Sequence, residues 1–183
     1  MKFKYPITVA VAFIAVLVLN NKIAEWKTYR FYSNLKNIDE PIREELKRNE
    51  LLSDEANAQI LVINLWATWC VPCQKEIPQL NQLVDKYENE NTLFISVTDE
   101  AENEVSEWLN LQKNEPLYFP IYENKRLMNY LFQLNPQPRL KKGHFPELLP
   151  TNIIIYNGKL MFFEQGFSEE NITKMDSVLN VIN

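Results

Sequence analysis

Two cysteines stand between a strand-length apolar run and an amphipathic helix, and this arrangement restricts the fold more than any other feature of the chain. Residues 60–66 (ILVINLW) are almost continuously apolar, as is typical of a strand buried on both faces of a parallel sheet. Cys70 and Cys73 follow, and apolar residues recur at helical spacing over residues 77–87. The pattern predicts an α/β domain with the cysteines at the N-terminus of a helix.

The remaining pattern predicts alternating strands and helices that close on a hairpin. Further strands are expected at 92–98, 118–122, 153–156 and 159–164, and further helices at 102–112, 125–133 and from Ser168 to about 181. Asn157-Gly158 between two apolar runs is a strong hairpin signal. We therefore expect a central mixed sheet flanked by helices, with a parallel core and an antiparallel edge.

The N-terminus carries a basic flank and a short apolar segment. Residues 6–19 are apolar and follow Lys2 and Lys4. As a helix they span about 21 Å, which is less than the roughly 30 Å of a hydrocarbon core and fits the apolar region of a signal peptide. Because no small-x-small cleavage site follows, we expect an uncleaved signal anchor over residues 1–22. A cleaved signal peptide and a buried core helix are the alternatives.

A polar stretch, residues 23–58, separates this anchor from the α/β domain expected over residues 59–183. Four apolar residues recur there at helical spacing, namely Leu35, Ile38, Ile42 and Leu46. Asp39 with Pro41 makes a plausible helix start. We expect a partly helical stalk that packs one stripe on the main domain, and a dimerising stripe is the alternative.

Composition excludes several classes of function. The net charge is -5 and no long Lys/Arg run occurs, which argues against a nucleic-acid partner. Three glycines cannot supply a Gly-rich phosphate loop, and the single histidine, His144, excludes a multi-histidine metal site. We expect neither a metal nor a bound cofactor, which leaves the cysteine pair to carry the chemistry.

The position of the cysteines suits thiol–disulfide exchange. At a helix N-terminus, free N–H groups and the helix dipole stabilise a thiolate, so the pKa of Cys70 should fall from about 8.5 toward neutrality. Cys70 could then attack a disulfide on another protein, and the more buried Cys73 could release the product from the mixed disulfide. The alternatives are an inert disulfide, which would constrain little of the unfolded chain, and half of a zinc site.

Residues 64–78 (NLWATWCVPCQKEIP) resemble the active-site segment of thioredoxin-fold proteins, specifically of the membrane-tethered TlpA/ResA type. The likeness is strong over residues 59–87 and continues more loosely through 119–121 and 149–153. It implies a thioredoxin-like fold whose redox centre is a Cys70–Cys73 disulfide.

The resemblance also implies roles for single residues. Pro150 takes the position of the family's cis-proline, which faces the cysteine pair and presents backbone to a substrate. The residues expected to bind substrate are Trp69, Pro72, Leu149 and Pro150. Thioredoxin itself has a buried aspartate that helps to move the proton of its second cysteine, and Asn64, which cannot titrate, stands at that position here.

Glu76 is the third catalytic candidate, beside the two cysteines. ResA-like proteins have a glutamate at this position, and its helical spacing places it on the same face as Cys73. A partly buried carboxylate would have a raised pKa and could exchange a proton with the thiol. The alternative is an ordinary glutamate in the first turn, where it favours the helix dipole.

Two regions depart from the family pattern. Charged, helix-like residues 35–58 replace the usual β-hairpin ahead of the first strand. Residues 133–148 form a longer, basic connection into the cis-proline, which would select a partner with an acidic surface or would be a plain solvated loop. His144, within this connection, is treated as incidental because nothing fixes it near the cysteines.

We therefore expect a membrane-anchored protein thiol–disulfide oxidoreductase with its catalytic domain outside the cytoplasm, or a secreted one if the signal is cleaved. Its partners would be a disulfide- or thiol-bearing protein and a membrane or soluble thiol electron donor. Cytochrome c apoprotein is a frequent target of the family, so cytochrome c maturation is one expected setting. Reduction is favoured over the alternatives, a disulfide oxidase or isomerase and a non-catalytic adaptor, because Val71-Pro72 lacks the histidine of strong oxidants.

Overall fold

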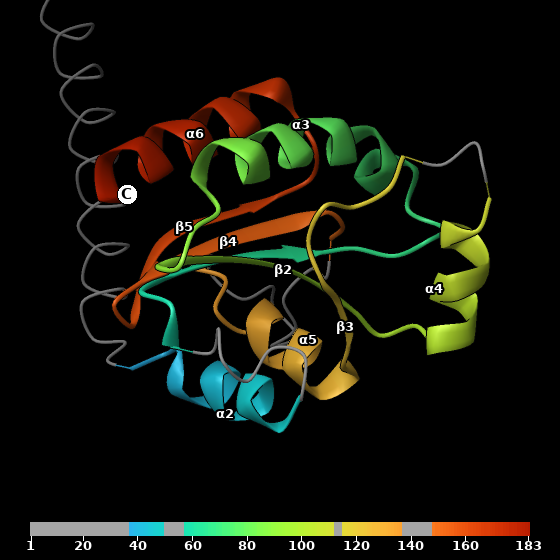
Figure 1. The fold of residues 1–183 in the computed structure, drawn as a ribbon, viewed down its shortest axis with the longest axis horizontal. Coiled ribbons are helices and arrows are strands. Elements are labelled where there is room, and N and C mark those ends of the chain that lie inside the picture. Colours follow the sequence, from blue (N-terminus) through green and yellow to red (C-terminus); the bar gives the residue numbers. More distant parts are fainter. Residues whose placement is uncertain (1–36, 50–56, 112–114, 137–147) are drawn as a thin grey trace, which may run out of the picture. The chain divides into compact units, whose positions relative to one another are not determined.

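One mixed sheet organises the computed structural model, which describes residues 37–49, 57–111, 115–136 and 148–183 (Figure 1). The strand order is β3-β2-β1-β4-β5. Strands β1 (Ile60–Leu65), β2 (Thr92–Thr98) and β3 (Ile121–Glu123) are parallel, whereas β4 (Thr151–Tyr156) is antiparallel to β1 and pairs with β5 (Lys159–Gln165) as a hairpin. The predicted α/β class, with its parallel core and antiparallel edge, is confirmed.

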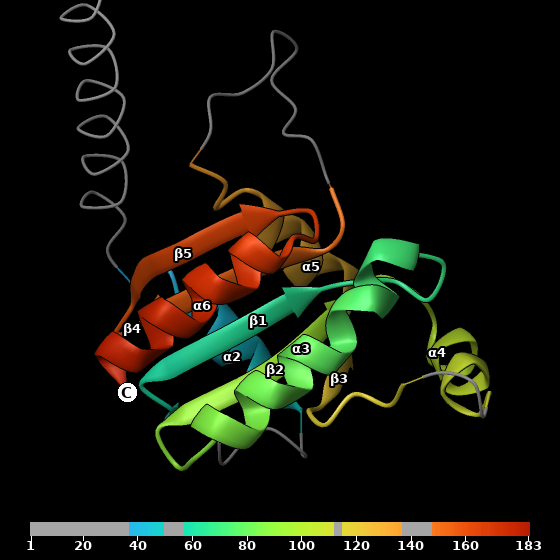
Figure 2. The same cartoon turned by 90° about the horizontal axis from the view of Figure 1, so that it is seen from above.

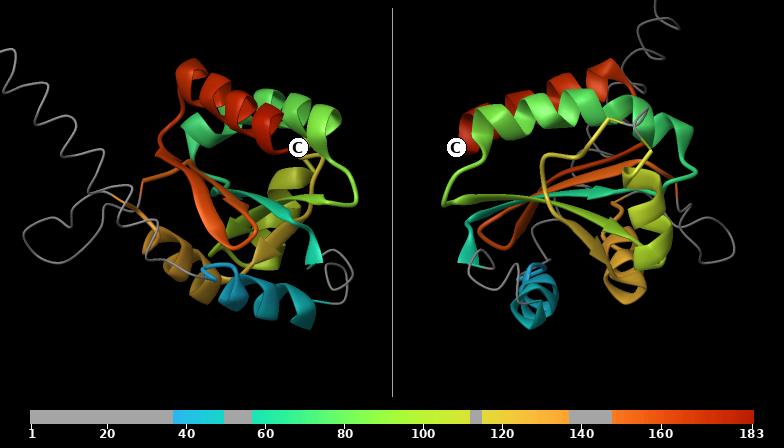
Figure 3. Two further views of the ribbon diagram at one scale, coloured as in Figure 1. Left: turned by 90° about the vertical axis from the view of Figure 1, so that its left-hand side faces the viewer. Right: turned by 45° about the vertical axis from the view of Figure 1, so that its right-hand side comes forward.

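Helices cover both faces of this sheet. Helices α3 (Val71–Tyr87) and α6 (Glu169–Ile182) lie on one face, and α2 (Glu40–Arg48) and α5 (Lys125–Phe132) lie on the other (Figures 1 and 3). The fifth described helix, α4 (Glu102–Leu109), stands to the side, beyond the carboxyl end of β2 (Figure 2). It ends before the predicted residue 112.

Alternation along β1 decides what each face of the sheet buries. Ile60 and Val62 belong to the core between the sheet and helices α3 and α6, which also contains Leu80, Phe94, Ile154, Phe162, Met175 and Leu179. Because side chains alternate along a strand, Asn64 continues the row of Ile60 and Val62 on this same face. A polar group therefore extends an apolar row just before the chain leaves the sheet for the cysteines.

Helix α2 packs against the domain through its apolar stripe. The side chains of Ile42 and Leu46 are fully buried, and the hydroxyl of Tyr130 on α5 donates a hydrogen bond to the backbone oxygen of Ile38 (2.8 Å). The expected packing is thus confirmed for these residues, while Leu35 lies outside the described residues. Helix α2 belongs to the same compact unit as the sheet, Lys36–Asn183.

The third strand starts later than the sequence predicts, at residue 121 instead of 118. Asn81 on α3 donates a hydrogen bond to the backbone oxygen of Pro116 (2.8 Å) and accepts one from the N–H of Tyr118 (3.1 Å). These two bonds hold the backbone against α3, so pairing with β2 begins only after Pro120, whose oxygen accepts a hydrogen bond from the N–H of Ser96.

The predicted hairpin turn is confirmed at Asn157 and Gly158, which have φ angles of 48° and 75°. Positive φ at both central residues is what a type I′ turn requires. A Cβ atom on Gly158 would lie 2.9 Å from Oδ1 of Asp39, the residue that precedes α2. Glycine is therefore required here both by the backbone and by close approach of the α2 segment.

Three expectations fall on residues outside the described ranges: the anchor over residues 1–22, the first part of the stalk and most of the basic connection 133–148, including His144. Among the helices that are described, none is long and apolar enough to cross a membrane.

Candidate active site

A disulfide between Cys70 and Cys73 lies at the N-terminus of α3, where the sequence places the pair. Cys70 is the N-cap residue, and its Sγ accepts a hydrogen bond from the N–H of Cys73 (3.2 Å). The two cysteines are 3% and 2% exposed, so in this oxidised state they are almost equally buried, in contrast to the expected difference. The N–H contact shows that the helix end presents donors to the sulfur that would become the thiolate.

The loop that precedes the disulfide is fixed by Glu100, which follows β2. Its carboxylate accepts hydrogen bonds from both the N–H (2.6 Å) and the hydroxyl (2.5 Å) of Thr68. The side chain of Gln74 on α3 donates to the backbone oxygen of Thr68 (2.6 Å). Trp69, which directly follows this fixed residue, is 69% exposed, so its indole ring faces solvent.

The two cysteines belong to an apolar cluster. It also contains Trp66, Ala67, Ile77, Val105 and Trp108. The rings of Trp66 and Trp108 meet edge to face, with centroids 5.1 Å apart, which joins α4 to the start of the cysteine loop. Leu149, half-buried, packs against this cluster. The structure therefore brings the segment before Pro150 to the cysteine pair.

The residues expected to bind substrate differ in exposure. The Leu149–Pro150 peptide bond is cis, in agreement with the position inferred for Pro150. Pro150 is buried, and its backbone oxygen accepts a hydrogen bond from the N–H of Gly166 (2.7 Å). Trp69 and Pro72 are exposed, as are two apolar neighbours that the sequence did not single out, Val71 and Leu148. The disulfide thus lies among exposed apolar side chains.

Glu76 is fully buried, and its carboxylate is bound by two asparagines. Nδ2 of Asn152 donates to Oε1 (2.6 Å), and Nδ2 of Asn64 donates to Oε2 (3.3 Å). Burial raises the pKa of Glu76 from 4.5 to about 8, while the two amide hydrogen bonds lower it. Glu76 is the sixth residue of α3, beyond its first turn, which removes the alternative of an ordinary first-turn glutamate.

Asn152 and Ser96 are site residues that the sequence reasoning missed. In the sheet, Asn64 on β1 pairs with Ser96 on β2 and with Asn152 on β4, so the three side chains form one polar row under α3. Asn64 donates from Nδ2 to Oδ1 of Asn152 (2.9 Å), and the Ser96 hydroxyl donates to Oδ1 of Asn64 (3.2 Å). The available signal was a polar residue inside two of the apolar strand runs, Asn64 and Ser96, and one directly before a third run, Asn152.

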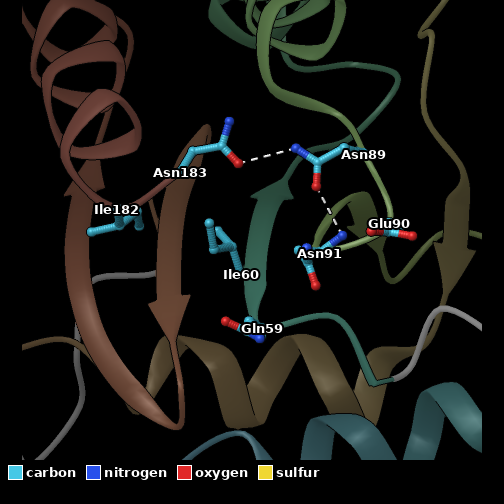
Figure 4. Close-up of a pocket in the computed structure, with 7 residues that line it drawn as sticks. All are labelled: Gln59, Ile60, Asn89, Glu90, Asn91, Ile182 and Asn183. Atoms are coloured by element: carbon cyan, nitrogen blue, oxygen red, sulfur yellow. Dashed lines mark hydrogen bonds between the residues drawn. The ribbon is translucent and has the colours of Figure 1, made fainter.

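A polar hollow of about 300 Å³ lies at the end of the sheet opposite the disulfide (Figure 4). Its lining residues are Gln59, Ile60, Asn89, Glu90, Asn91, Ile182 and Asn183. Ile60 opens β1, whereas Cys70 follows the end of that strand, so this hollow is separate from the disulfide. The Asn89 side chain donates to Asn183 (3.0 Å) and accepts from the N–H of Asn91 (2.8 Å), and these polar groups therefore satisfy one another. In the ranges described, no group of three or more His, Cys, Asp or Glu side chains is placed to hold a metal ion.

The comparisons with known proteins agree with this site. The thiol-disulfide oxidoreductase ResA of Bacillus cereus is 39% identical over 64 residues, which are 34% of this chain and 35% of that protein. ResA of Oceanobacillus iheyensis is 24% identical over 133 residues, which are 71% of this chain and 68% of that protein. The match thus spans about a third of the length of the Bacillus relative. These relatives confirm the resemblance seen in residues 64–78.

Solved structures and a family model extend the likeness to most of the domain. A putative thiol:disulfide interchange protein DsbE from Chlorobium tepidum superposes with a TM-score of 0.55 at 20% identity, over 72% of this chain and 84% of that one, which shows the fold alone. The model of the AhpC/TSA family matches residues 37–155, about two thirds of the chain. The protein, a thioredoxin-like α/β domain with its cysteine pair on α3, therefore belongs to the AhpC/TSA family.

Proposed function

We propose that this protein is a thiol–disulfide oxidoreductase that exchanges electrons with partner proteins through Cys70 and Cys73. The single observation that carries this proposal is the disulfide at the N-terminus of α3, where a backbone N–H already faces Cys70 Sγ. The ResA relatives support it, because the thiol-disulfide oxidoreductase ResA of Bacillus cereus is 39% identical to this chain over 64 residues.

In the proposed reaction the reduced protein acts as the electron donor. The Cys70 thiolate attacks one sulfur of a partner's disulfide, a mixed disulfide forms, and the partner's other cysteine leaves as a thiolate. Cys73 loses its proton and attacks Cys70 Sγ, which expels the partner's first cysteine as a second thiolate. Two electrons pass to the partner, and the Cys70–Cys73 disulfide remains. A thiol electron donor, membrane-bound or soluble, reverses these steps and restores the dithiol.

Glu76 is the proposed proton acceptor for the resolving step. It lies one turn beyond Cys73 on α3, and its pKa of about 8 is close to that of a thiol, so a proton can pass between the two groups near neutral pH. This role supplies the titrating group that Asn64 cannot provide. Trp69, Pro72, Leu149 and Pro150 are the proposed substrate-binding residues, because they flank the disulfide or pack beside it.

The proposed setting is extracytoplasmic. Residues 1–22 would anchor the chain in a membrane and residues 23–58 would connect the anchor to the thioredoxin-like domain, as the TlpA/ResA resemblance implies. Signal cleavage would instead give a secreted enzyme. Reduction is the proposed direction, because the Val71-Pro72 dipeptide supplies no cation to stabilise a Cys70 thiolate.

The reduction potential of the full-length protein tests this proposal. The protein is equilibrated in thiol–disulfide buffers, and alkylation reports how much of the dithiol is present, with Cys70→Ser and Cys73→Ser variants as controls for single-thiol reactivity. A potential near or below roughly -270 mV supports the reductant. A value nearer roughly -120 mV identifies an oxidase. If the pair does not cycle at all, the protein is a non-catalytic adaptor and the proposal is wrong.

A further inference from the structure

We propose that Asn152 and Asn64 are positioning residues, which hold the Glu76 carboxylate between α3 and the sheet and keep it able to accept a proton there. The inference deepens the proposed function and rests on it in one respect, namely that the proton held by Glu76 is exchanged with the Cys73 thiol. The hydrogen-bond geometry on which it stands is independent of that exchange.

Hydrogen bonds from the neighbouring strands fix the orientation of the two amide side chains. The Ser96 hydroxyl donates to Oδ1 of Asn64, which leaves the Nδ2 group of Asn64 to donate to Oδ1 of Asn152 and to Glu76. Since Oδ1 of Asn152 is occupied in this way, its Nδ2 is the group that faces Glu76, and it makes the shortest contact in the network (2.6 Å). The orientation of Asn152 is therefore set across the sheet, from β2 through β1.

The Glu76 carboxylate lies in surroundings with little charge. Strands β1, β2 and β4 contain no acidic or basic residue, and Glu76 has no ion-pair partner among the residues that the structure describes. On α3, Lys75 is exposed and Cys73 is held in the disulfide. On β5, Glu164 lies opposite Asn152 in the sheet, is partly exposed and approaches Lys174 (3.9 Å). The two amides thus supply the polar contacts that stabilise the buried charge.

The charged and the protonated forms of Glu76 need different hydrogen-bond partners. A carboxylate accepts hydrogen bonds at both oxygens, whereas a carboxylic acid must donate one. Both asparagines present N–H groups to Glu76, so these two contacts satisfy the carboxylate and not the acid. The two amides therefore stabilise the charged form of Glu76 and oppose the effect of burial. The pKa of about 8 is then a balance between burial, which raises it, and these amides, which lower it.

Titration of Glu76 in the full-length, oxidised protein tests the inference. Carboxyl ¹³C chemical shifts are followed against pH after selective labelling of glutamate, and Glu76→Gln identifies the signal. In Asn152→Leu the midpoint should move upward by about one pH unit, a tenfold increase in proton affinity, because a short amide hydrogen bond to the carboxylate is lost. Asn81→Leu is the matched control, since Asn81 is an equally buried asparagine on α3 that binds Pro116 and Tyr118.

Two milder variants keep the test decisive if Asn152→Leu does not fold. Asn152→Thr retains a residue that favours strands but lacks the amide N–H, and it should shift the midpoint in the same direction. Ser96→Ala releases Asn64 and should give a smaller upward shift. An unchanged midpoint in a folded Asn152 variant overturns the inference.

The result of the Glu76 titration can be distinguished from the result of the test of the proposed function. If Asn152→Thr moves the Glu76 midpoint in a protein whose cysteines never exchange with a partner, the positioning role stands and the oxidoreductase proposal fails. If the wild-type protein exchanges disulfides and the Asn152→Thr midpoint is unmoved, the positioning role fails alone.

Discussion

Substitution of Glu76 by glutamine should change how the stability of the protein depends on pH. The folded state holds Glu76 with a pKa of about 8, against an ordinary value of 4.5, so the folded state binds a proton that the unfolded chain has released. The contribution of this raised pKa to the free energy of unfolding is fully present below pH 4.5 and is lost as the pH rises through 8. Glutamine carries no charge at any pH, so the variant lacks this dependence.

The expected size follows from the two pKa values. Each pKa unit corresponds to about 1.36 kcal/mol, and each group is half-titrated at its own pKa, so the free energy of unfolding of the wild type should fall by about 4 kcal/mol relative to Glu76→Gln between pH 4.5 and pH 8. Between pH 5 and pH 7 the relative fall should be about 2.5 kcal/mol. Since domains are typically stable by about 5–15 kcal/mol, this is a large effect.

Urea unfolding of the oxidised full-length chain, followed by tryptophan fluorescence at several pH values, measures this difference. Comparison of the wild type with Glu76→Gln cancels the titration of the other groups. Glu107→Gln, which removes an exposed carboxylate from α4, controls for the loss of one charge. If the difference between wild type and Glu76→Gln is the same at pH 5 and pH 8, the burial argument for Glu76 is refuted.

Three further substitutions test the structure around the site. Leu46→Ala should lower the free energy of unfolding by about 2–5 kcal/mol in urea, because a fully buried leucine is lost, whereas the exposed Lys47→Ala should change it little; equal effects would mean that α2 is not packed as described. Gly158→Ala should cost more stability than Gly166→Ala, since both have positive φ but only Gly158 meets a neighbouring atom, and the thermal midpoints should rank in that order; the reverse ranking would contradict the turn. Glu100→Gln removes a charge-assisted bond worth roughly 1.5–3 kcal/mol and should accelerate amide hydrogen exchange in the loop before the disulfide about tenfold or more. An unchanged exchange rate would show that Glu100 does not hold the loop.

Local pattern was sufficient to predict most of the architecture. The continuous apolar run before the cysteines, the helical period after them and the Asn157-Gly158 turn each depend on residues that are neighbours in sequence. Their secondary structure therefore follows from side-chain period and turn chemistry, and their order restricts the sheet to a parallel core with a hairpin. The position of the cysteines at the start of a helix was predictable for the same reason.

The surroundings of the cysteines were decided only by the tertiary structure. Thr68 and Glu100 are 32 residues apart, and Glu76 and Asn152 are 76 apart, so no local period relates them. Asn64 is visible in the sequence as a polar residue within an apolar run. Strand register, however, decides which polar residues share its row, and helix packing decides that Glu76 lies over that row. A buried carboxylate takes its pKa from its desolvation and from its few partners, and both are properties of the assembled core, which a local pattern does not contain.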